Sequence, residues 1–307
     1  KRYETEWSFS FDHLADTIGE GVGQVLEAAG ISGDDKTKTS TFSEPVDGAV
    51  SAQVKLDLTI GATDVRASAE AESQSLIDAE VTHVGDVDFN VRSDGQRKLI
   101  RLGQTPRDFI GSARDTLSQA RSAFTKRADL RWDVRLNPDV LLDLEINTGV
   151  TNNSLDLREL RLASFKLNSG TGRTKLGLPA AAKRYAADVN NGTGESAVEI
   201  TDGAEVDLTL NCGAGAVSLL IQPGADVKAD IRGGVGSVTI ELPEGAAVQL
   251  KAVNGLGSVK VPANFSRTKN DDFPFGNNGT WETPGFAQAE RKIVLNYAGG
   301  VGNLTVR

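Results

Sequence analysis

The segment DVKADIRGGVGSVTIE, residues 226–241, contains the pattern that decides the fold. Apolar residues alternate with polar ones at Val227, Ala229 and Ile231, and they alternate again at Val238 and Ile240. This period of two predicts two short strands, each with one buried face. The glycines between them allow positive φ angles and a close approach of neighbouring backbones. The segment therefore predicts two strands joined by a tight bend.

The same pattern recurs through the second half of the chain at a nearly constant spacing. The glycines that mark the bends are Gly149, Gly170, Gly192, Gly213, Gly234, Gly255 and, after a long insertion, Gly300. The first six are 21 or 22 residues apart. A fixed period near 20 residues is typical of solenoids. We therefore predict a mainly β fold, a single-stranded β-solenoid of about seven coils of about 21 residues, in which successive coils stack.

Residues 1–130 follow a different pattern and are predicted to form an α+β cap region. It contains an amphipathic helix at 12–29, strands within 54–103 and a second amphipathic helix at 106–128. The repeat pattern already returns from Val54 onward, so a related coil or sheet is expected to begin there. The solenoid itself is predicted to cover residues 131–307, with an insertion at 262–290.

Charge is distributed unevenly along the chain. Residues 1–91 contain 6 basic and 18 acidic side chains (net −12), residues 92–184 contain 18 and 10 (net +8), and residues 185–307 contain 9 and 14 (net −5), which gives the total of −9. The basic middle block supplies a candidate interaction surface: Arg107, Arg114, Arg121, Arg158, Arg161, Lys166, Arg173, Lys175, Lys183 and Arg184.

This basic surface has several interpretations. It could be an ordinary solvated face, or it could receive anionic lipid headgroups, wall polymers or the acidic part of another copy. The three arginines of the 106–128 helix recur every seven residues beside its apolar seam, which fits packing on its own domain, a dimer contact or a membrane-surface helix. Nucleic acid is not expected as a partner, because aromatic residues are not interleaved with the basic residues and the whole chain is acidic.

The sequence contains few groups that suggest catalysis or cofactor binding. Its two histidines and single cysteine lack metal-ligand spacing, so no metal or cofactor is predicted. The acidic pairs Asp34-Asp35 and Asp271-Asp272 lie in loop-like sequence and do not predict the facing carboxylates of a glycosidase. No apolar run approaches the 18 residues of a membrane span. Four aromatic residues near the last coil are predicted to close the far end of the solenoid: Phe273, Phe275, Trp281 and Phe286.

Several segments resemble the bacterial toast-rack domain. They are WDVRLNP at 132–138, LDL at 142–144, LDLREL at 155–160 and the later glycine turns GVGSV and GVGNL. The resemblance covers about residues 46–307 except for 106–128. The family includes the C-terminal domains of LiaF-type cell-wall-active antibiotic response proteins and the head-GIN adhesins. It implies an extracytoplasmic place in the cell envelope, anchored by a segment outside this chain, and a link to envelope stress signalling.

From the residues and the resemblance together we predict a non-enzymatic, envelope-associated interaction or scaffold module. Its partner is expected to be another protein or a second copy, with anionic lipid or a wall polymer as further options. The alternative is a cell-surface adhesin or filament subunit that assembles through its solenoid ends. A carbohydrate-active enzyme is the less favoured third class.

Overall fold

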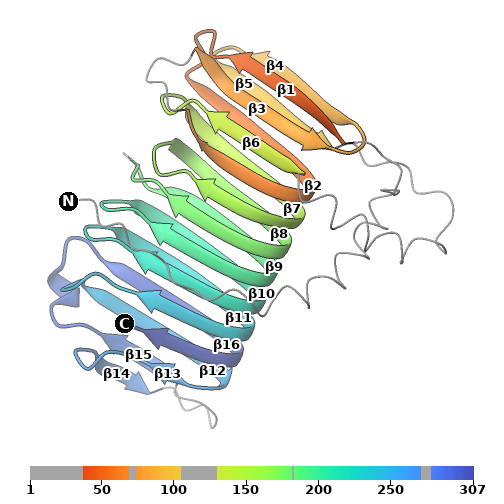
Figure 1. The fold of residues 1–307 in the computed structure, drawn as a ribbon. Coiled ribbons are helices and arrows are strands. Elements are labelled where there is room, and N and C mark those ends of the chain that lie inside the picture. The colour runs from red at the N-terminus through yellow and green to blue at the C-terminus, as the bar shows by residue number, and fades with distance from the viewer. Residues whose placement is uncertain (1–36, 69–73, 105–129, 182, 271–277) are drawn as a thin grey trace, which may run out of the picture.

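The computed structural model describes residues 37–68, 74–104, 130–181, 183–270 and 278–307. In this part of the chain nearly all regular structure is β, and the strands join into one 16-stranded sheet. The exception is a 3₁₀ turn, η1, at Phe286–Gln288. Figure 1 shows the strands stacked into a rod. The prediction of a mainly β fold is therefore confirmed.

Eight bent rungs form the body of the rod. Each rung has a first arm before its bend and a second arm after it. In order along the rod, the rungs are β2 (Ser51–Ala67), β7 (Leu141–Asp156), β8 (Arg161–Leu178), β9 (Tyr185–Ile200), β10 (Glu205–Ile221), β11 (Asp226–Glu241), β16 (Ile293–Val306), and β12 (Val248–Leu256) with β13 (Val259–Lys260). Neighbouring rungs are parallel and in register, apart from one register shift between β7 and β8 at Leu142/Asp143. Rung β2 is the related coil expected from Val54 onward.

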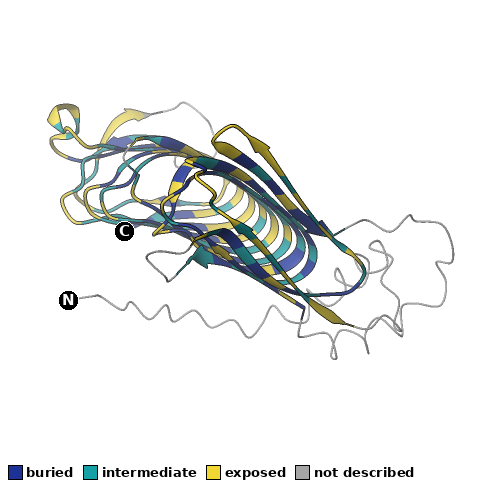
Figure 2. Cartoon of the chain, turned by 90° about the horizontal axis from the view of Figure 1, so that it is seen from above, coloured by how far each residue is buried: buried dark blue, intermediate teal, exposed yellow. Residues whose placement is uncertain are grey.

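The core of the rod lies between the two arms of every rung. In β11, Val227, Ala229 and Ile231 are buried on the first arm, and Val238 and Ile240 are buried on the second. The corresponding side chains of the other rungs belong to the same hydrophobic cluster. Figure 2 shows buried and exposed residues alternating along the strands. Because one rung alone cannot bury its apolar face, its stability depends on the rungs above and below it.

Two columns of glycines allow the rungs to bend at the same place. A Cβ atom on Gly234 would lie 2.2 Å from the carbonyl oxygen of Gly213 in the next rung. A Cβ atom on Gly236 would lie 1.8 Å from the carbonyl oxygen of Gly215, and Gly236 also has a φ angle of 145°. A side chain at either position would force the neighbouring backbone to move. The regular spacing of glycine in the sequence is thus a consequence of stacking.

Stacking does not follow chain order at the C-terminal end. Ile293 of β16 pairs with both Val227 of β11 and Val248 of β12, so the last strand lies between two rungs that precede it. Figure 1 shows the dark blue β16 inside the stack, with the C terminus beside it. The expectation that successive coils stack is therefore wrong for the last two coils. Strand β15 (Gly279–Glu282) already covers the outer edge of β12, so the chain returns on the inner side of that rung.

The other end of the rod is built from five additional strands. On the first arm of β2, β5 (Arg97–Gln104) pairs in parallel and carries β4 (Val87–Asp94) on its outer edge. On the second arm of β2, β6 (Arg131–Leu136) pairs with β2, β3 (Ser75–His83) pairs with β6, and β1 (Lys38–Pro45) pairs with β3 at the outer edge. The strands predicted within 54–103 are therefore present.

The outer strands of the two arms meet and close this end. The rings of Phe42 in β1 and Phe89 in β4 have centroids 5.4 Å apart. Lys98 of β5 is 5% exposed and donates hydrogen bonds to Glu44 Oε1 at 2.5 Å and to the Pro45 carbonyl oxygen at 2.6 Å. Burial acts to lower the pKa of Lys98, but its hydrogen bonds to carboxylates outweigh burial and raise the pKa above its usual value.

The two amphipathic helices predicted at 12–29 and 106–128 lie outside the described residues. The boundary predicted between residues 130 and 131 stays a prediction, and the sheet runs across it because β2 pairs with β7. No helix in the described ranges is long and apolar enough to cross a membrane.

Candidate functional site: an asparagine ladder and its groove

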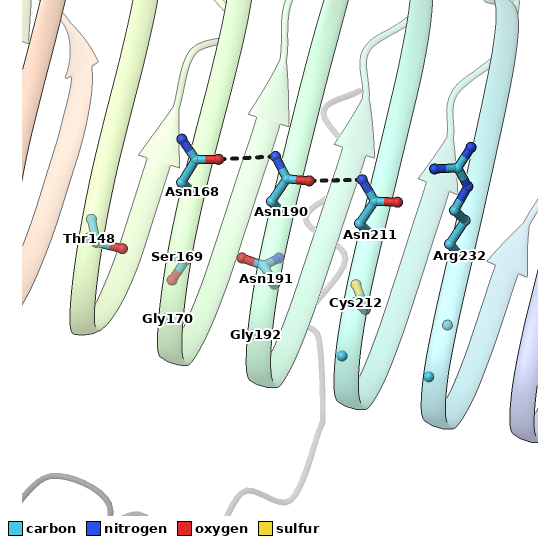
Figure 3. A pocket seen from close by; sticks show the side chains of 13 residues that line it. Thr148, Asn168, Ser169, Gly170, Asn190, Asn191, Gly192, Asn211, Cys212 and Arg232 are labelled. Carbon is cyan, nitrogen blue, oxygen red and sulfur yellow. Dashed lines mark hydrogen bonds between the residues drawn. The ribbon is translucent and has the colours of Figure 1, made fainter. Parts of the chain in front are cut away.

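One row of side chains on the outside of the first arms connects four rungs. Asn147, Asn168, Asn190 and Asn211 occupy equivalent positions in β7, β8, β9 and β10. The Nδ2 atom of each later asparagine donates to the Oδ1 atom of the one before it, at 2.7, 3.0 and 2.8 Å along the row. All three bonds run in the same direction, and Figure 3 shows two of them. We call this row the asparagine ladder.

The ladder begins at a carboxylate. Asn147 Nδ2 donates to Asp57 Oδ1 of β2 at 2.8 Å, and Arg101 Nε contacts the other oxygen of that carboxylate at 3.0 Å. Asp57 therefore orients the first amide, and each amide orients the next one. Aligned hydrogen bonds of this kind polarise one another. At the other end, Asn211 Oδ1 has no hydrogen-bond partner among the described residues.

A second row lies beside the ladder and alternates in charge. Lys55, Glu145, Lys166 and Asp188 follow one another in β2, β7, β8 and β9. Lys55 Nζ lies 2.9 Å from Glu145 Oε1. Hydrogen bonds from Asn147 and Lys55 lower the pKa of Glu145 below its usual value. Opposite charges on adjacent strands favour the observed register over one that brings like charges together.

A groove of about 630 Å³ runs beside the ladder across the bends of β7 to β11. At about 4.8 Å per rung, it extends about 19 Å along the rod. Its polar lining includes the amides of Asn168, Asn190 and Asn211 and the guanidinium of Arg232, all drawn in Figure 3. Arg232 is exposed and has no ion-pair or hydrogen-bond partner in the part of the chain that the structure describes. Each amide in the middle of the ladder keeps one N–H and one lone pair for a ligand.

The thiol of Cys212 also lines the groove. Burial raises the pKa of Cys212 to about 11, although its hydrogen bond with Ser196 acts in the opposite direction. The thiol is therefore neutral at neutral pH, which disfavours a nucleophilic role because the thiolate is the reactive form.

The predicted basic surface is divided between the arms, and acidic neighbours bind several of its members. Arg158 Nε contacts Asp156 at 2.7 Å, which raises the pKa of Arg158 and lowers the pKa of Asp156. Arg184 bridges two rungs, since its guanidinium contacts Asp207 at 2.9 Å and Asp226 at 2.7 Å. These arginines thus serve as links between rungs or turns.

The remaining members of that surface are placed differently. Arg173 Nε lies 3.5 Å from Glu195 in the adjacent rung, and Arg161 donates to the carbonyl oxygen of Asp139 at 2.8 Å. Three members are exposed lysines: Lys166, Lys175 and Lys183. The other three, Arg107, Arg114 and Arg121, lie outside the described residues. The described members do not converge on the groove, and their role as an interaction surface stays a prediction.

Two of the four aromatic residues assigned to the far end lie in the described part of the chain. Trp281 of β15 is opposite Leu250 of β12, is 5% exposed, and has the guanidinium of Arg267 5.1 Å from its ring centroid. Phe286 is half-buried in η1, with Lys292 Nζ 5.3 Å from its ring. Phe273 and Phe275 lie outside the described residues, as does the acidic pair Asp271-Asp272.

The asparagine ladder is absent from the residues selected by sequence reasoning. Its signal was present, because asparagines at 147, 168, 190 and 211 follow the same spacing as the glycines two residues after each of them. Asparagine carries neither a charge nor a catalytic group, so only its period marks these positions. No group of three or more histidine, cysteine, aspartate or glutamate residues that could hold a metal ion occurs in the described ranges.

Comparison with known proteins assigns the chain to a family. The family described as the N-terminal domain of toast_rack, DUF2154, matches residues 31–199, which is more than half of the chain. The chain belongs to the toast-rack family. The resemblance noted in the sequence is therefore confirmed.

Two solved structures are similar to this toast-rack chain. One is a proposed cell adhesion protein from Clostridium sporogenes ATCC 15579, with 17% identity, a TM-score of 0.43, and coverage of 88% of this chain and 99% of the other. The second is a proposed adhesin from Bacteroides fragilis NCTC 9343, with 10% identity, a TM-score of 0.29, and coverage of 90% and 100%. No curated protein matches the toast-rack chain in sequence.

Proposed function

We propose that this protein is a non-enzymatic interaction module of the bacterial cell envelope, whose groove binds an extended, hydroxyl-rich polymer that carries acidic groups. The observation that carries the proposal is the row of amides that ends beside the exposed guanidinium of Arg232. Membership of the toast-rack family supports the envelope role. We place the module outside the cytoplasm, anchored by a segment beyond this chain, and assign it to the envelope stress response.

The chemistry of the groove fits such a polymer. Side-chain amides both donate and accept hydrogen bonds, which suits hydroxyl groups. The amides repeat about every 4.8 Å, a spacing close to the length of one sugar unit in an extended glycan. Arg232 provides a charge-assisted, bidentate contact for a carboxylate or phosphate. The continuous sheet holds these groups in place before binding, so little ordering of the protein is required.

The net charge of −9 limits where an acidic polymer can bind. An acidic protein repels an acidic polymer at long range, so binding needs a local cation in the right place. Arg232 is that cation, and its removal should weaken binding more than removal of an arginine elsewhere. Arg92 of β4 is a matched control, because it is also exposed and lies near the opposite end of the rod.

Titration calorimetry with an oligogalacturonate as the probe tests this function. We expect saturable binding to the native chain and weaker binding of a neutral glucan of equal length. Arg232→Gln should weaken oligogalacturonate binding at least tenfold, because a hydrogen bond to a charged group contributes about 1.5–3 kcal/mol. Arg92→Gln should leave it unchanged. Absence of binding, or equal losses in both variants, would contradict the proposal.

The alternative, an adhesin or filament subunit that assembles through its ends, is favoured by one observation. Among the described strands, β1 and β4 at one end and β13 and β14 (Ser266–Asn270) at the other have one unpaired edge each. Open edges can pair with another chain. Light scattering and electron microscopy separate the alternatives, since fibres of stacked rods support end-to-end assembly and isolated rods speak against it.

A further inference from the structure

The C-terminal rung occupies a slot between two rungs that are adjacent in the sequence. Strand β16 pairs in parallel with β11 on one side and with β12 on the other. It also pairs with the short β13 on its second arm. In the rest of the rod from β7 to β11, each rung lies directly on the one that precedes it in the chain. Strand β16 is therefore inserted between two rungs that both precede it in the chain.

The connection between β11 and β12 does not itself create this slot. Leu220 of β10 and Glu241 of β11 are register partners. In the connection from β10 to β11, Val227 comes seven positions after Leu220, and the chain moves up by one rung. In the connection from β11 to β12, Val248 also comes seven positions after Glu241, but here the chain moves up by two rungs. The length of the connection therefore permits β12 to lie on β11 directly, and the slot exists because β16 fills it.

The slot accepts a strand with a particular sequence pattern. Leu295, Tyr297 and Leu304 of β16 are buried in the common core. At the bend, Gly300 and Gly302 continue the two glycine columns, and a Cβ atom on Gly302 would lie 1.6 Å from the carbonyl oxygen of Gly236. A side chain at this position would meet the Gly236 carbonyl oxygen, so glycine favours stacking on β11 in this register.

The segment that leads to β16 is long enough to deliver the strand elsewhere. It runs from Thr283, after β15, to Lys292, and it would span about 30 Å if extended. Its contacts with the rod include hydrogen bonds from Arg291 to the carbonyl oxygens of Gly203 and Gly224. Thr283 itself is buried and its Oγ1 accepts a hydrogen bond from the Val248 N–H at 2.8 Å, so the start of the segment is fixed on β12. The contacts of Arg291 are polar and exposed, so they restrain the rest of the segment much less than the core restrains β16.

We propose that β16 is an exchangeable strand and that the slot between β11 and β12 also accepts residues 293–306 of a second copy of this chain. Reciprocal exchange of this strand gives a dimer in which every rung keeps the contacts it has in the single chain. Such a dimer differs from the monomer mainly in the connecting segment, so protein concentration during folding decides how much forms. The proposal goes beyond polymer binding and does not depend on the groove.

Asp230 and Asn296 provide a direct test, because they are register partners on the outside of β11 and β16, with Asn296 Nδ2 2.9 Å from Asp230 Oδ1. Two differently tagged full-length copies are co-expressed, one with Asp230→Cys and the other with Asn296→Cys. After oxidation we expect a disulfide between residues 230 and 296 of different chains, identified by mass spectrometry. The control copy carries Asn303→Cys, which lies on the other arm of β16, and should give at least tenfold less cross-linked product. Cross-linking no higher than in this control would overturn the proposal.

A second experiment examines the slot by itself. In full-length Gly302→Val the chain's own β16 is excluded, and we expect a fluorescent peptide of residues 291–307 to bind with 1:1 stoichiometry. The same peptide with Gly302→Val should bind at least tenfold more weakly, and the control chain Gly203→Ala, whose β16 is unaltered, should not bind the native peptide. Equal binding of both peptides, or no binding to a Gly302→Val chain that still unfolds cooperatively, would overturn the proposal. If Gly302→Val does not fold, the cross-linking result decides alone.

Discussion

The substitution Gly215→Ala tests whether the glycine columns are required by contact between rungs. Gly215 of β10 has a φ angle of 137°, and a Cβ atom there would lie 1.8 Å from the carbonyl oxygen of Gly194 in β9. Gly203 is the matched control, because it has a φ angle of 71° in a turn and a Cβ atom there would meet nothing within 4 Å. Both positions disfavour L-residues, but only one is also blocked by a neighbouring backbone.

The difference between these positions predicts the size of the effect. An L-residue in the left-handed region costs about 1–2 kcal/mol, which applies to both substitutions. At Gly215 the adjacent rung must also move away, which breaks backbone hydrogen bonds of about 0.5–1.5 kcal/mol each and loosens the core behind the bend. We expect Gly215→Ala to lower the free energy of unfolding by about 3–5 kcal/mol and Gly203→Ala to lower it by about 1–2 kcal/mol.

Urea unfolding followed by circular dichroism measures both free energies. Hydrogen exchange should show that Gly215→Ala loses most amide protection in β9 and β10, since the stability of each rung depends chiefly on its neighbours. A cost for Gly215→Ala no greater than that for Gly203→Ala would refute the reasoning, because the bend would then be able to accommodate a side chain.

Three further predictions concern the ladder, the thiol and the closed end. Asn190→Ala should lower the free energy of unfolding by about 1–3 kcal/mol through the loss of two hydrogen bonds, and a double-mutant cycle with Asn211→Ala should show coupling, whereas strictly additive losses would contradict a continuous ladder. The rate of alkylation of Cys212 should keep rising with pH up to its raised pKa of about 11, and a rate that levels off below pH 9 would argue against burial of the thiol. Because the folded state disfavours the thiolate, the same shift removes stability as pH rises above the pKa of an unfolded thiol, about 8.5. Phe42→Ala removes the contact with Phe89 and should lower the free energy of unfolding by about 1–3 kcal/mol, while an unchanged value would show that the end is closed by other contacts.

The repeat in the sequence was sufficient to predict the rungs. Alternation such as that of Val227, Ala229 and Ile231 identifies the buried face, because side chains of a strand point to opposite sides. The spacing of Gly213 and Gly234 identifies the bend, because stacked backbones leave no room for Cβ atoms there. Both features are local or periodic, so they can be read without knowing which segments meet. The resemblance to the toast-rack family rested on segments such as WDVRLNP at 132–138, and the family match over residues 31–199 confirms it.

The polar contacts required the stacked structure. The amides of Asn168 and Asn190 can bond only because their rungs are adjacent and in register. The basic residues Arg158 and Arg184 suggested a free positive surface, but Asp156 supplies a partner within the same turn region and Asp226 supplies one two rungs away. Charge counted along the chain does not reveal such pairing, because it depends on contacts across rungs.

The sequence by itself therefore determined the repeating unit, its buried face and its glycine bend, since these arise from backbone geometry within one rung and its immediate contacts. Only the tertiary structure decided the order of the last rungs, in which β16 separates β11 from β12. The rungs share one pattern, so the pattern alone permits several stacking orders. The choice among them comes from β15, which covers the outer edge of β12 and leaves β16 the position between β11 and β12.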